Sequence, residues 1–551
     1  MRAAIAWSYD MLTEEEQSLF RRLSVFSAGC TLEAAQTVCG DRADDGPPFL
    51  DRLASLTDRS LLQWQPDAEG TPRFWMLESL REFGLEQVEA RGEHGEVRAR
   101  HAAFFLDLAE RAEPELHRRE QHLWVRRLEA EHGNCRVALG WLLDTGDAER
   151  AARLASALHW FWFLHGDIFE ARRWLERILA SREVLADAIL ARVLTAAGML
   201  AWSQGDDKMG GPLLDDAVRG LRRIDARRDL AYALHFWGHI MGRQGDHRAA
   251  AAAFEESGEL YAGVQDEWGV AFSLNCLALP TFRLGEQARA IQFFEDSQAR
   301  LRQIGDRYML GRSLHMLADV LAERGEFTRA GALLEEGIAF YREHGDRWGL
   351  LRSLQVLASV ALRQGRFLEA LPPCKETLLW AKDLGVTDVA TWSLAALARV
   401  AAALGQMERA VRLLGASERL RREDLPPLLR TLREQTLDAA RRALGEGQVE
   451  ATRRTGALLT LAEAAEEALA LEPPQDEDGA TRRASGPLSP RESEVAALVA
   501  QGLSNREIGR TLFIGRRTVD THIQSILNKL GFNRRAEIAA WVGRQGTASP
   551  G

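Results

Sequence analysis

AYALHFWGHIMGRQGDHRAAAAAF, residues 231–254, is one copy of a pattern that fills the middle of the chain. A glycine returns every 40 residues, a small residue precedes it by seven positions, and another small residue follows it by five. Small residues let two antiparallel helices approach closely, and a glycine between them can adopt the turn conformation. The pattern therefore predicts a stack of helical hairpins. The six turn glycines are Gly205, Gly245, Gly285, Gly325, Gly365 and Gly405.

The hairpin stack resembles tetratricopeptide repeats, whose usual unit of about 34 residues would here be lengthened by about six residues between hairpins. We expect the array to span residues 98–470, with less regular hairpins over Phe104–Leu143 and around residues 159–165. The helices of residues 407–470 should end it. Such repeats stack into a solenoid with a long concave face, which implies binding of a peptide, a protein or a small-molecule effector.

Aromatic side chains in the array could form either its core or a binding site. Trp268, Tyr308 and Trp348 share one position of the repeat, which favours packing between hairpins over ligand binding. The run Trp160–Phe163 is likewise interpreted as hairpin core. The residues alone identify no ligand for the concave face.

The end of the chain carries a second pattern, LSPRESEVAALVAQGLSNREIGRTLFIGRRTVDTHIQSILNKL, at residues 488–530. A capping box at Ser489–Glu492 opens a first helix, and another at Ser504–Glu507 opens a second. After a turn at residues 514–517, a third helix should start near Thr518. Two helices joined by a short turn in this order predict a helix-turn-helix.

The predicted third helix has two contrasting faces. Apolar residues recur at helical spacing from Val519 to Leu530, which indicates the face that packs on the other helices. Asp520, Thr521 and Gln524 then lie on the opposite face. Polar side chains on an outward helix face are available to a binding partner.

Charge separates the end of the chain from the rest. Residues 488–551 hold nine Arg and Lys against five Asp and Glu, a net charge of +4. The whole chain carries −10, so residues 1–487 carry −14. A small basic segment on an acidic chain is a candidate surface for phosphate groups. The charge distribution therefore favours binding of nucleic acid by the tail.

The tail resembles the DNA-binding module of LuxR-type response regulators. Three blocks carry the resemblance, and they cover about 60 of the 551 residues: L-S-x-R-E-x-E-V, G-x-S-N-x-E-I and R-T-V-x-x-H-I-x-x-I-x-x-K-L-G. The resemblance implies a four-helix module at residues 488–546 whose third helix enters the major groove of double-stranded DNA. A fourth helix, expected after Asn533, would pair two copies of the module as a homodimer.

The same resemblance implies roles for individual residues. Asp520, Thr521 and Gln524 become the expected base readers, and a carboxylate at Asp520 can accept a hydrogen bond from cytosine N4. Positions at the two ends of the third helix become phosphate contacts, and they are Arg516, Arg517, Thr518 and Lys529. The full set of expected DNA-binding residues is Ser504, Asn505, Arg506, Arg516, Arg517, Thr518, Asp520, Thr521, Gln524 and Lys529.

The first ninety residues predict a different small fold, which we assign to residues 1–92. Helical spacing predicts four helices, and residues 60–77 predict a β-hairpin around a polar turn. Helices followed by such a hairpin are typical of a winged helix. Its acidic cluster leaves no clear basic face, so DNA binding is not expected there. The four helices are Ala3–Leu12, Glu14–Leu23, Thr31–Val38 and Leu50–Leu56.

The stretches WSYDML, EQSLFRRLSVFSAG and RFWMLESLREFGLEQ resemble the winged-helix segment that follows the nucleotide-binding domain in AfsR-like signal-transduction ATPases of bacteria. The phosphate loop of that domain, G-x-x-x-x-G-K-S/T, has no match in the chain, and none of the four lysines follows a glycine. We therefore expect no ATPase domain and no cofactor. The chain would be either a naturally short form or the product of a start codon placed too far downstream.

Composition limits the cellular compartment and the kinds of site that we expect for the protein. Five scattered cysteines, with no C-x-x-C pair and no histidine set near them in sequence, predict neither disulfides nor a metal site. No apolar run approaches the roughly 18 residues of a membrane span, and acidic residues from Asp10 onward argue against a signal peptide. We expect a cytoplasmic protein with no membrane partner. Residues 471–487 are polar, contain Pro and Gly, and predict a linker.

Three functions remain to be compared. The first is a sequence-specific transcriptional regulator whose tail binds DNA and whose array senses a signal or binds a partner. The second is an interaction scaffold whose tail docks protein, and the third is a fragment of an ATP-dependent signalling switch. No carboxylate pair or nucleophile constellation stands out, so enzymatic activity is not expected. The ordered motif blocks of the tail favour the first.

Overall fold

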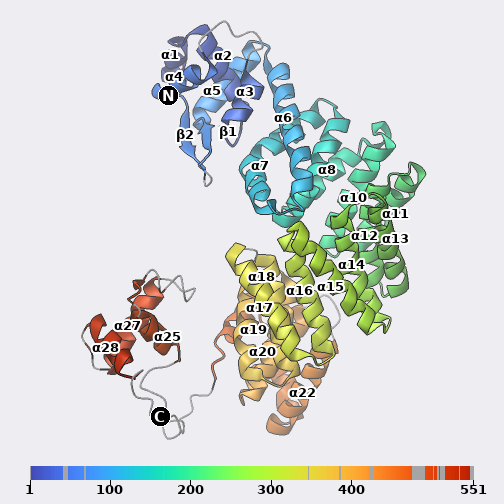
Figure 1. Ribbon diagram of the computed structural model, residues 1–551, viewed down its shortest axis with the longest axis vertical. Coiled ribbons are helices and arrows are strands. Elements are labelled where there is room, and N and C mark those ends of the chain that lie inside the picture. The colour runs from blue at the N-terminus through green and yellow to red at the C-terminus, as the bar shows by residue number, and fades with distance from the viewer. Residues whose placement is uncertain are drawn as a thin grey trace. The chain divides into compact units, whose positions relative to one another are not determined.

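The computed structural model describes residues 2–40, 48–67, 70–165, 167–344, 347–383, 386–420, 427–473 and 490–545, the last range with gaps at 501, 506–507, 509–515, 531 and 533. The chain divides into two compact units, Met1–Leu471 and Glu472–Gly551. Both are built mainly of α-helices, which confirms the predicted fold class (Figure 1). The predicted linker, residues 471–487, lies outside the described residues from position 474 onward.

The amino-terminal segment of the first unit has the predicted helices and hairpin. Strands β2 and β3 pair antiparallel with Trp64 opposite Phe74, and a third strand, β1, joins β3. β1 was not predicted because two residues are too few for strand periodicity. The elements are α1 (Arg2–Asp10), α2 (Glu14–Leu23), β1 (Cys30–Thr31), α3 (Leu32–Cys39), α4 (Phe49–Asp58), β2 (Gln63–Pro66), β3 (Pro72–Trp75) and α5 (Glu78–Ala90).

Polar contacts fix this segment to α7 (Gln121–Asp144). The side-chain oxygen of Asn134 accepts a hydrogen bond from the Ser27 backbone N–H at 2.9 Å, and its amide donates to the Gly29 carbonyl at 2.9 Å. Gly29 has a φ of 71°, and a Cβ there would lie 2.5 Å from the Phe74 carbonyl oxygen, so only glycine fits. These contacts make the winged-helix segment part of the same compact unit as the array.

The array consists of consecutive antiparallel helices. All six predicted turn glycines adopt positive φ, between 69° and 94°, which confirms the 40-residue hairpin pattern. The helices are α6 (His94–Glu115), α7, α8 (Ala148–His165), α9 (Ile168–Leu179), α10 (Asp187–Ser203), α11 (Asp207–Arg223), α12 (Arg227–Arg243), α13 (His247–Gly263), α14 (Glu267–Arg283), α15 (Gln287–Ile304), α16 (Arg307–Glu323), α17 (Phe327–His344), α18 (Arg347–Arg363), α19 (Phe367–Asp383), α20 (Thr387–Ala403), α21 (Met407–Leu420), α22 (Pro427–Leu444), α23 (Glu446–Ala457) and α24 (Leu461–Leu469).

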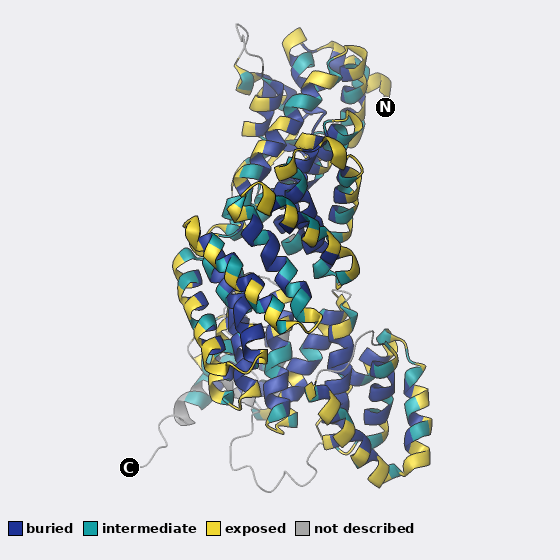
Figure 2. Cartoon of the chain, turned by 90° about the vertical axis from the view of Figure 1, so that its right-hand side faces the viewer, coloured by how far each residue is buried: buried dark blue, intermediate teal, exposed yellow. Residues whose placement is uncertain are grey.

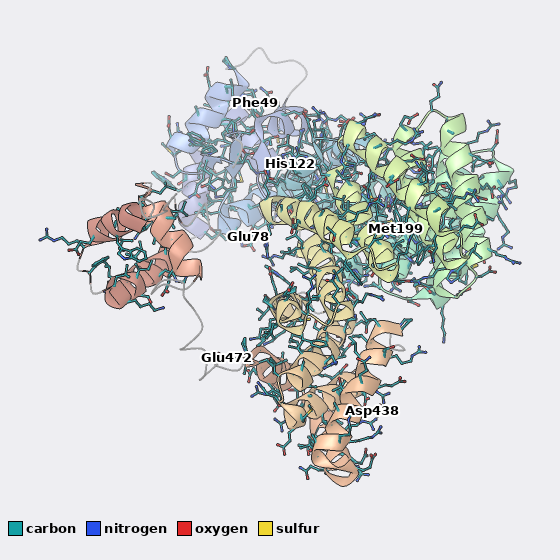
Figure 3. The ribbon with its side chains drawn as sticks, turned by 60° about the horizontal axis from the view of Figure 1, so that its bottom comes forward. Phe49, Glu78, His122, Met199, Asp438 and Glu472 are labelled. Atoms are coloured by element: carbon teal, nitrogen blue, oxygen red, sulfur yellow. The ribbon has the colours of Figure 1, made fainter. Side chains whose placement is uncertain are left out.

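Small residues lie where the helices of a hairpin approach each other. Ala290, Ala330 and Ala370 are fully buried, and a Cβ on Gly238 would lie 3.0 Å from the ring of Phe254. Buried residues lie where the helices pack against one another, and exposed residues lie on the outer parts of the helices and in the turns (Figure 2). Met199 of α10, labelled in Figure 3, is one of the fully buried side chains. Alternation of small and large side chains therefore holds each hairpin together.

The second unit contains α25 (Pro490–Ala500), α27 (Arg516–Leu530) and α28 (Arg535–Gln545). Its core is formed by Val495, Val499, Val519, Ile526 and Ile538, which come from all three helices and are at most 3% exposed. α27 begins at Arg516, two residues before the predicted start near Thr518, so Arg516 and Arg517 belong to the helix and not to the turn. The predicted second helix lies mostly outside the described residues.

No helix among the described residues combines the length and the hydropathy needed to cross a bilayer.

Candidate functional site

The outward face of α27 is the first candidate site. Ile523 and Ile526 are buried against α25 and α28, whereas Gln524 between them is exposed. Asp520 and Thr521 lie in the same helix, four and three residues before Gln524, so the helical period assigns them to the same side of its backbone. This register is the one expected for a helix that presents polar residues to a partner.

The structure does not describe the side chains of several expected DNA-binding residues. Arg506 lies outside the described residues altogether, and the backbone alone is described for the others. Those others, all within α27, are Arg516, Arg517, Thr518, Asp520 and Thr521.

Lys529, an expected phosphate contact, has a partner inside the tail. Its Nζ lies 2.7 Å from Glu492 Oε2, and the Ser525 hydroxyl donates to Glu492 Oε1 at 2.7 Å. The Glu492 side chain is only 5% exposed, whereas that of Lys529 is 46% exposed. Glu492 therefore joins α25 to α27 and offsets the charge of Lys529. Sequence reasoning assigned Glu492 to a capping box and did not anticipate this link.

Asn505 also has a structural partner. Its side-chain oxygen accepts a hydrogen bond from the Arg535 guanidinium, which also donates to the Leu503 carbonyl. Arg535 therefore fixes the start of α28 to residues 503–505, which follow α25. Ser504, next to Asn505, is exposed. Of these two expected DNA-binding residues, Ser504 is exposed, and Asn505 is hydrogen-bonded to the first residue of α28.

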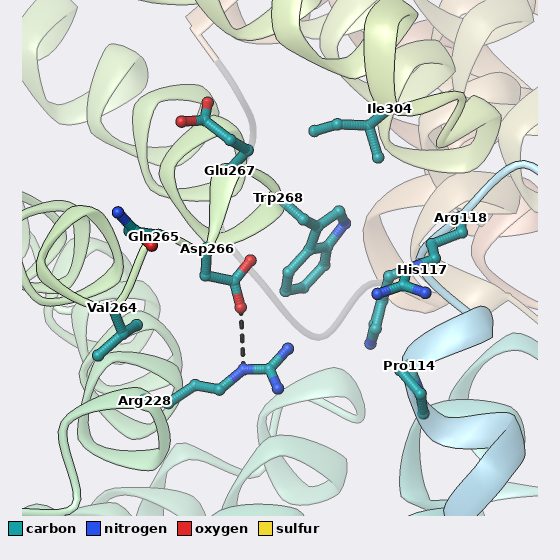
Figure 4. A pocket seen from close by; sticks show the side chains of 10 residues that line it. All are labelled: Pro114, His117, Arg118, Arg228, Val264, Gln265, Asp266, Glu267, Trp268 and Ile304. Atoms are coloured by element: carbon teal, nitrogen blue, oxygen red, sulfur yellow. Dashed lines mark ion pairs between the residues drawn. The ribbon is translucent and has the colours of Figure 1, made fainter.

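A cavity of about 390 Å³ in the array is the second candidate site (Figure 4). Trp268 of α14 forms its aromatic wall, and the ring of His117 lies 4.0 Å from that of Trp268, measured between ring centroids. Arg228 pairs with Asp266 across 2.9 Å. The cavity thus combines an aromatic surface with groups of both charges. Its lining residues are Pro114, His117, Arg118, Arg228, Val264, Gln265, Asp266, Glu267, Trp268 and Ile304.

A buried carboxyl group fixes the position of Trp268. The indole N–H of Trp268 donates to Asp306 Oδ2 at 2.8 Å, and the backbone N–H of Met309 donates to Asp306 Oδ1 at 3.0 Å. Burial raises the pKa of Asp306 to about 6, although these hydrogen bonds act in the opposite direction. Because Trp268 is 9% exposed, it is both hairpin core and cavity wall.

The aromatic side chains of the array differ in how far they are buried. Trp160, Phe161 and Trp162 are at most 1% exposed, which confirms the interpretation as core for these three residues, while Phe163 is partly buried against the same core. Trp348, which shares the repeat position of Trp268, is 45% exposed and does not form core. The prediction of packing at this repeat position is therefore correct for Trp268 and wrong for Trp348.

Cys276 of α14 lies beside two histidines of α12, His235 and His239, in a group that could hold a metal ion. The sequence predicted no histidine set near the cysteines. This prediction is wrong for Cys276, because the fold brings two histidines beside it. The helical repeat brings residues about 40 positions apart into neighbouring helices, so the group could have been found by aligning successive repeats.

Three family profiles match separate parts of the chain. Residues 486–542 match bacterial regulatory proteins of the luxR family, residues 12–89 match a winged helix-turn-helix domain, and residues 310–344 match a tetratricopeptide repeat. Each match falls on a segment for which the sequence predicted that fold.

Curated relatives support the same assignment. A protein of Mycobacterium tuberculosis named as an HTH-type transcriptional regulator is 32% identical over 276 residues, which cover 49% of this chain and 31% of that protein. The nitrate/nitrite response regulator NarL of Escherichia coli is 42% identical over 62 residues, covering 11% of this chain and 29% of NarL. The chain spans about a third of the length of the curated relatives it matches.

One solved structure shares the fold of most of the chain. It is a signal transduction ATPase with a tetratricopeptide repeat sensor from Pyrococcus horikoshii, with a TM-score of 0.53, 15% identity, and coverage of 83% of this chain and 64% of that one. The chain is thus a homologue of HTH-type transcriptional regulators that carries an amino-terminal winged helix-turn-helix, tetratricopeptide repeats and a carboxy-terminal helix-turn-helix module of the luxR family.

Proposed function

We propose that this chain is a sequence-specific DNA-binding transcriptional regulator. Its tail would read the major groove through α27, and two tails would pair as a homodimer through α28. The observation that carries the proposal is the exposed Gln524 on the third helix of a luxR-family module. A side-chain amide offers one donor and one acceptor, which match N6 and N7 of adenine in the major groove.

Phosphate contacts would come from the two ends of α27. Arg516, Arg517 and Thr518 occupy its first turn, where free backbone N–H groups and the helix dipole also favour an anion. Lys529 in its last turn would exchange part of its pairing with Glu492 for a phosphate oxygen. The net charge of +4 on residues 488–551 agrees with binding of this kind.

Replacing Gln524 with alanine should relax base choice at one position of the target. The expected loss is about 1–3 kcal/mol on the preferred sequence and little on random DNA, because only the base contact is removed. Arg516→Ala should instead weaken all sequences alike and lower the salt slope by about one. Binding of labelled duplexes at several salt concentrations measures both effects.

A matched control checks that Arg516→Ala does not act through net charge alone. Arg454→Ala removes a cation from a side chain that is 79% exposed on α23 of the other unit. DNA affinity should be unchanged in this variant. If Gln524→Ala left sequence preference intact, the assignment of Gln524 as a base reader would be wrong.

Competition between DNA sequences separates the proposed function from its alternatives. A regulator should prefer its target over random DNA by about 10³-fold or more, with affinity falling steeply as salt rises. A scaffold whose tail docks protein would show neither behaviour. The family matches and the relatives' names indicate a regulator and not an enzyme. Binding of labelled ATP by the chain would instead favour the ATP-dependent switch.

The array would act as the sensor, with the 390 Å³ cavity beside Trp268 as the site for a peptide, a protein segment or a small-molecule effector. An effector can shift the regulator between states only if it binds them unequally. If the array keeps the tail from binding DNA until an effector binds, operator binding by the full chain should be weaker than binding by residues 472–551 alone, compared at equal dimer concentration. Equal affinities would exclude autoinhibition by the array.

A further inference from the structure

Three potential metal ligands meet in the interior of the array. His235 and His239 lie one turn apart on α12, and Cys276 lies on the neighbouring α14. Cys276 Sγ is 3.5 Å from His235 Nε2 and 3.4 Å from His239 Nε2. The three ligand atoms all lie within 4.8 Å of one another.

These separations fit a shared metal ion. Bonds of about 2.0–2.3 Å from a metal to nitrogen and sulfur, at angles between tetrahedral and trigonal, put two such ligand atoms roughly 3.4–3.7 Å apart. The two sulfur–nitrogen distances of 3.4 and 3.5 Å lie within or close to that range. The sulfur is therefore already spaced from both imidazole nitrogens for a shared ion.

Aromatic rings hold both imidazoles in place. Phe272 stacks on His235 with ring centroids 3.4 Å apart, and Trp202 stacks on His239 at 4.7 Å. His235 and Cys276 are at most 2% exposed, whereas His239 is partly exposed and would leave a path for entry. Rings fixed by stacking lose little freedom when they bind a metal, as in other preorganised sites.

The ligands are in the protonation states that a metal needs, or can reach them. Burial lowers the pKa of His235 and His239 well below that of a free imidazole, which favours the neutral form that a metal needs. Burial raises the pKa of Cys276 to about 11. Binding must therefore release one proton, with the sulfur–hydrogen bond replaced by a sulfur–metal bond and the proton passed to solvent.

Charge and ligand number distinguish between metals. Two neutral imidazoles and one thiolate carry a charge of −1, so a monovalent ion gives a neutral site and a divalent ion leaves +1. Arg312 acts on both histidines and on Cys276 as a nearby positive charge, and among the described residues no carboxylate belongs to the group. A buried excess charge beside an arginine is unfavourable. Thiolate and imidazole ligands suit copper(I), whereas structural zinc almost always takes four ligands.

We propose that His235, His239 and Cys276 form a copper(I) site that joins α12 to α14. The alternative is a purely structural arrangement, in which the thiol and the imidazoles hydrogen-bond to one another. The site does not depend on the DNA-binding function of the tail.

The test is anaerobic titration of the full chain with copper(I) against the chromogenic chelator bathocuproine disulfonate. One copper(I) per chain should be withheld from the chelator, and X-ray absorption should show one sulfur and two nitrogen neighbours. Cys276→Ser should lower the copper affinity by at least about 100-fold, while Cys374→Ser, at another buried thiol, should leave it unchanged.

A second variant keeps the result interpretable if Cys276→Ser fails to fold. His239→Phe keeps a ring against Trp202 but removes a ligand, so it should fold and lose the tight copper. Circular dichroism checks the fold of each variant. Retention of copper by His239→Phe, or failure of the native chain to withhold copper, would overturn the proposal. Preferential binding of zinc in the same titration would overturn the choice of metal.

Discussion

Lowering the pH from 7.5 to 5.5 should lower the free energy of unfolding of the first unit by about 2 kcal/mol or more when no metal is bound. Three histidines, His101, His159 and His235, are at most 7% exposed. Burial is the largest cause of a lowered pKa in each, to about 3 for His101. An unfolded imidazole has a pKa of about 6.5, so His101 and His315, whose pKa values in the folded chain are both about 3, cost roughly 1.4 kcal/mol each at pH 5.5.

The direction of the effect follows from proton uptake. Above pH 6.5 these imidazoles are neutral in both states, and stability is at its full value. As the pH falls below 6.5, the unfolded chain binds protons that the folded chain excludes, so the free energy of unfolding decreases. His117, His239 and His315 also have lowered pKa values, mainly through burial, and act in the same direction.

Asp306 opposes the histidines but is outweighed by them. Burial raises its pKa to about 6, against about 3.9 for an unfolded aspartate, so its contribution to stability is present at low pH and is lost as the pH rises through 6. Between pH 7.5 and 5.5 it regains about 1 kcal/mol, because its carboxyl group is about three-quarters protonated at the lower pH. Burial also raises the pKa of Asp229 and Asp319, which act in the same direction as Asp306. The six histidines with lowered pKa values act against these three carboxyl groups.

Urea unfolding followed by circular dichroism at pH 7.5, 6.5 and 5.5 measures this effect. The midpoint should change little between the first two values and fall clearly at the third. His101→Leu should reduce the pH dependence by about one proton, since this ring lies in an aromatic cluster with Phe26 and Phe105. A midpoint that stays constant down to pH 5.5 would contradict the neutral state of the buried histidines.

The hairpin array could be predicted from sequence because its signals are local and repeated. Gly245 and Gly285 each close a turn between helices of 17 or 18 residues, and the same spacing returns along the array. A repeated turn residue reports on backbone conformation directly, so no knowledge of distant contacts was needed. The β2–β3 hairpin was predictable for the same reason, since Asp67 is joined to Gly70 and Thr71 by local backbone hydrogen bonds.

The sites depend on contacts that sequence spacing does not reveal. Cys276 meets His235 and His239 because α12 and α14 are neighbours in the stack, a relation that appears when successive repeats are aligned but not in the linear spacing of the three residues. The cavity beside Trp268 draws its wall from α6 to α15, nearly 200 residues apart. In the tail, the outward position of Gln524 was predictable from helical period, but the pairing of Lys529 with Glu492 was not. Side-chain partners across elements require the three-dimensional structure.

The last helices of the array also make a close contact that the 40-residue pattern does not predict. Helices α21 and α23 cross at Gly415 and Gly456, neither of which belongs to the 40-residue pattern. A Cβ on Gly456 would lie 2.1 Å from the Arg412 carbonyl oxygen, and one on Gly415 would lie 2.2 Å from the Arg453 carbonyl oxygen. Both obstacles are backbone atoms, so the helices themselves would have to separate.

Gly456→Ala should therefore destabilise the first unit by about 2 kcal/mol, and Gly456→Val by more. Alanine gains up to about 1 kcal/mol over glycine in a helix, but overpacking at a tight crossing typically costs about 1–3 kcal/mol or more. Separation would also weaken the contact of Arg453 in α23 with Glu418 in α21, now 2.7 Å apart.

Gly447→Ala is the matched control, because Gly447 lies in the same helix and nothing would approach its Cβ within 4 Å. It should leave stability unchanged or raise it by up to about 1 kcal/mol, since helix propensity acts there without steric conflict. Thermal and urea unfolding of the two variants measure the difference. Equal stability of Gly456→Ala and Gly447→Ala would mean that α21 and α23 are not held at this close distance, because helix propensity alone cannot distinguish two glycines of one helix.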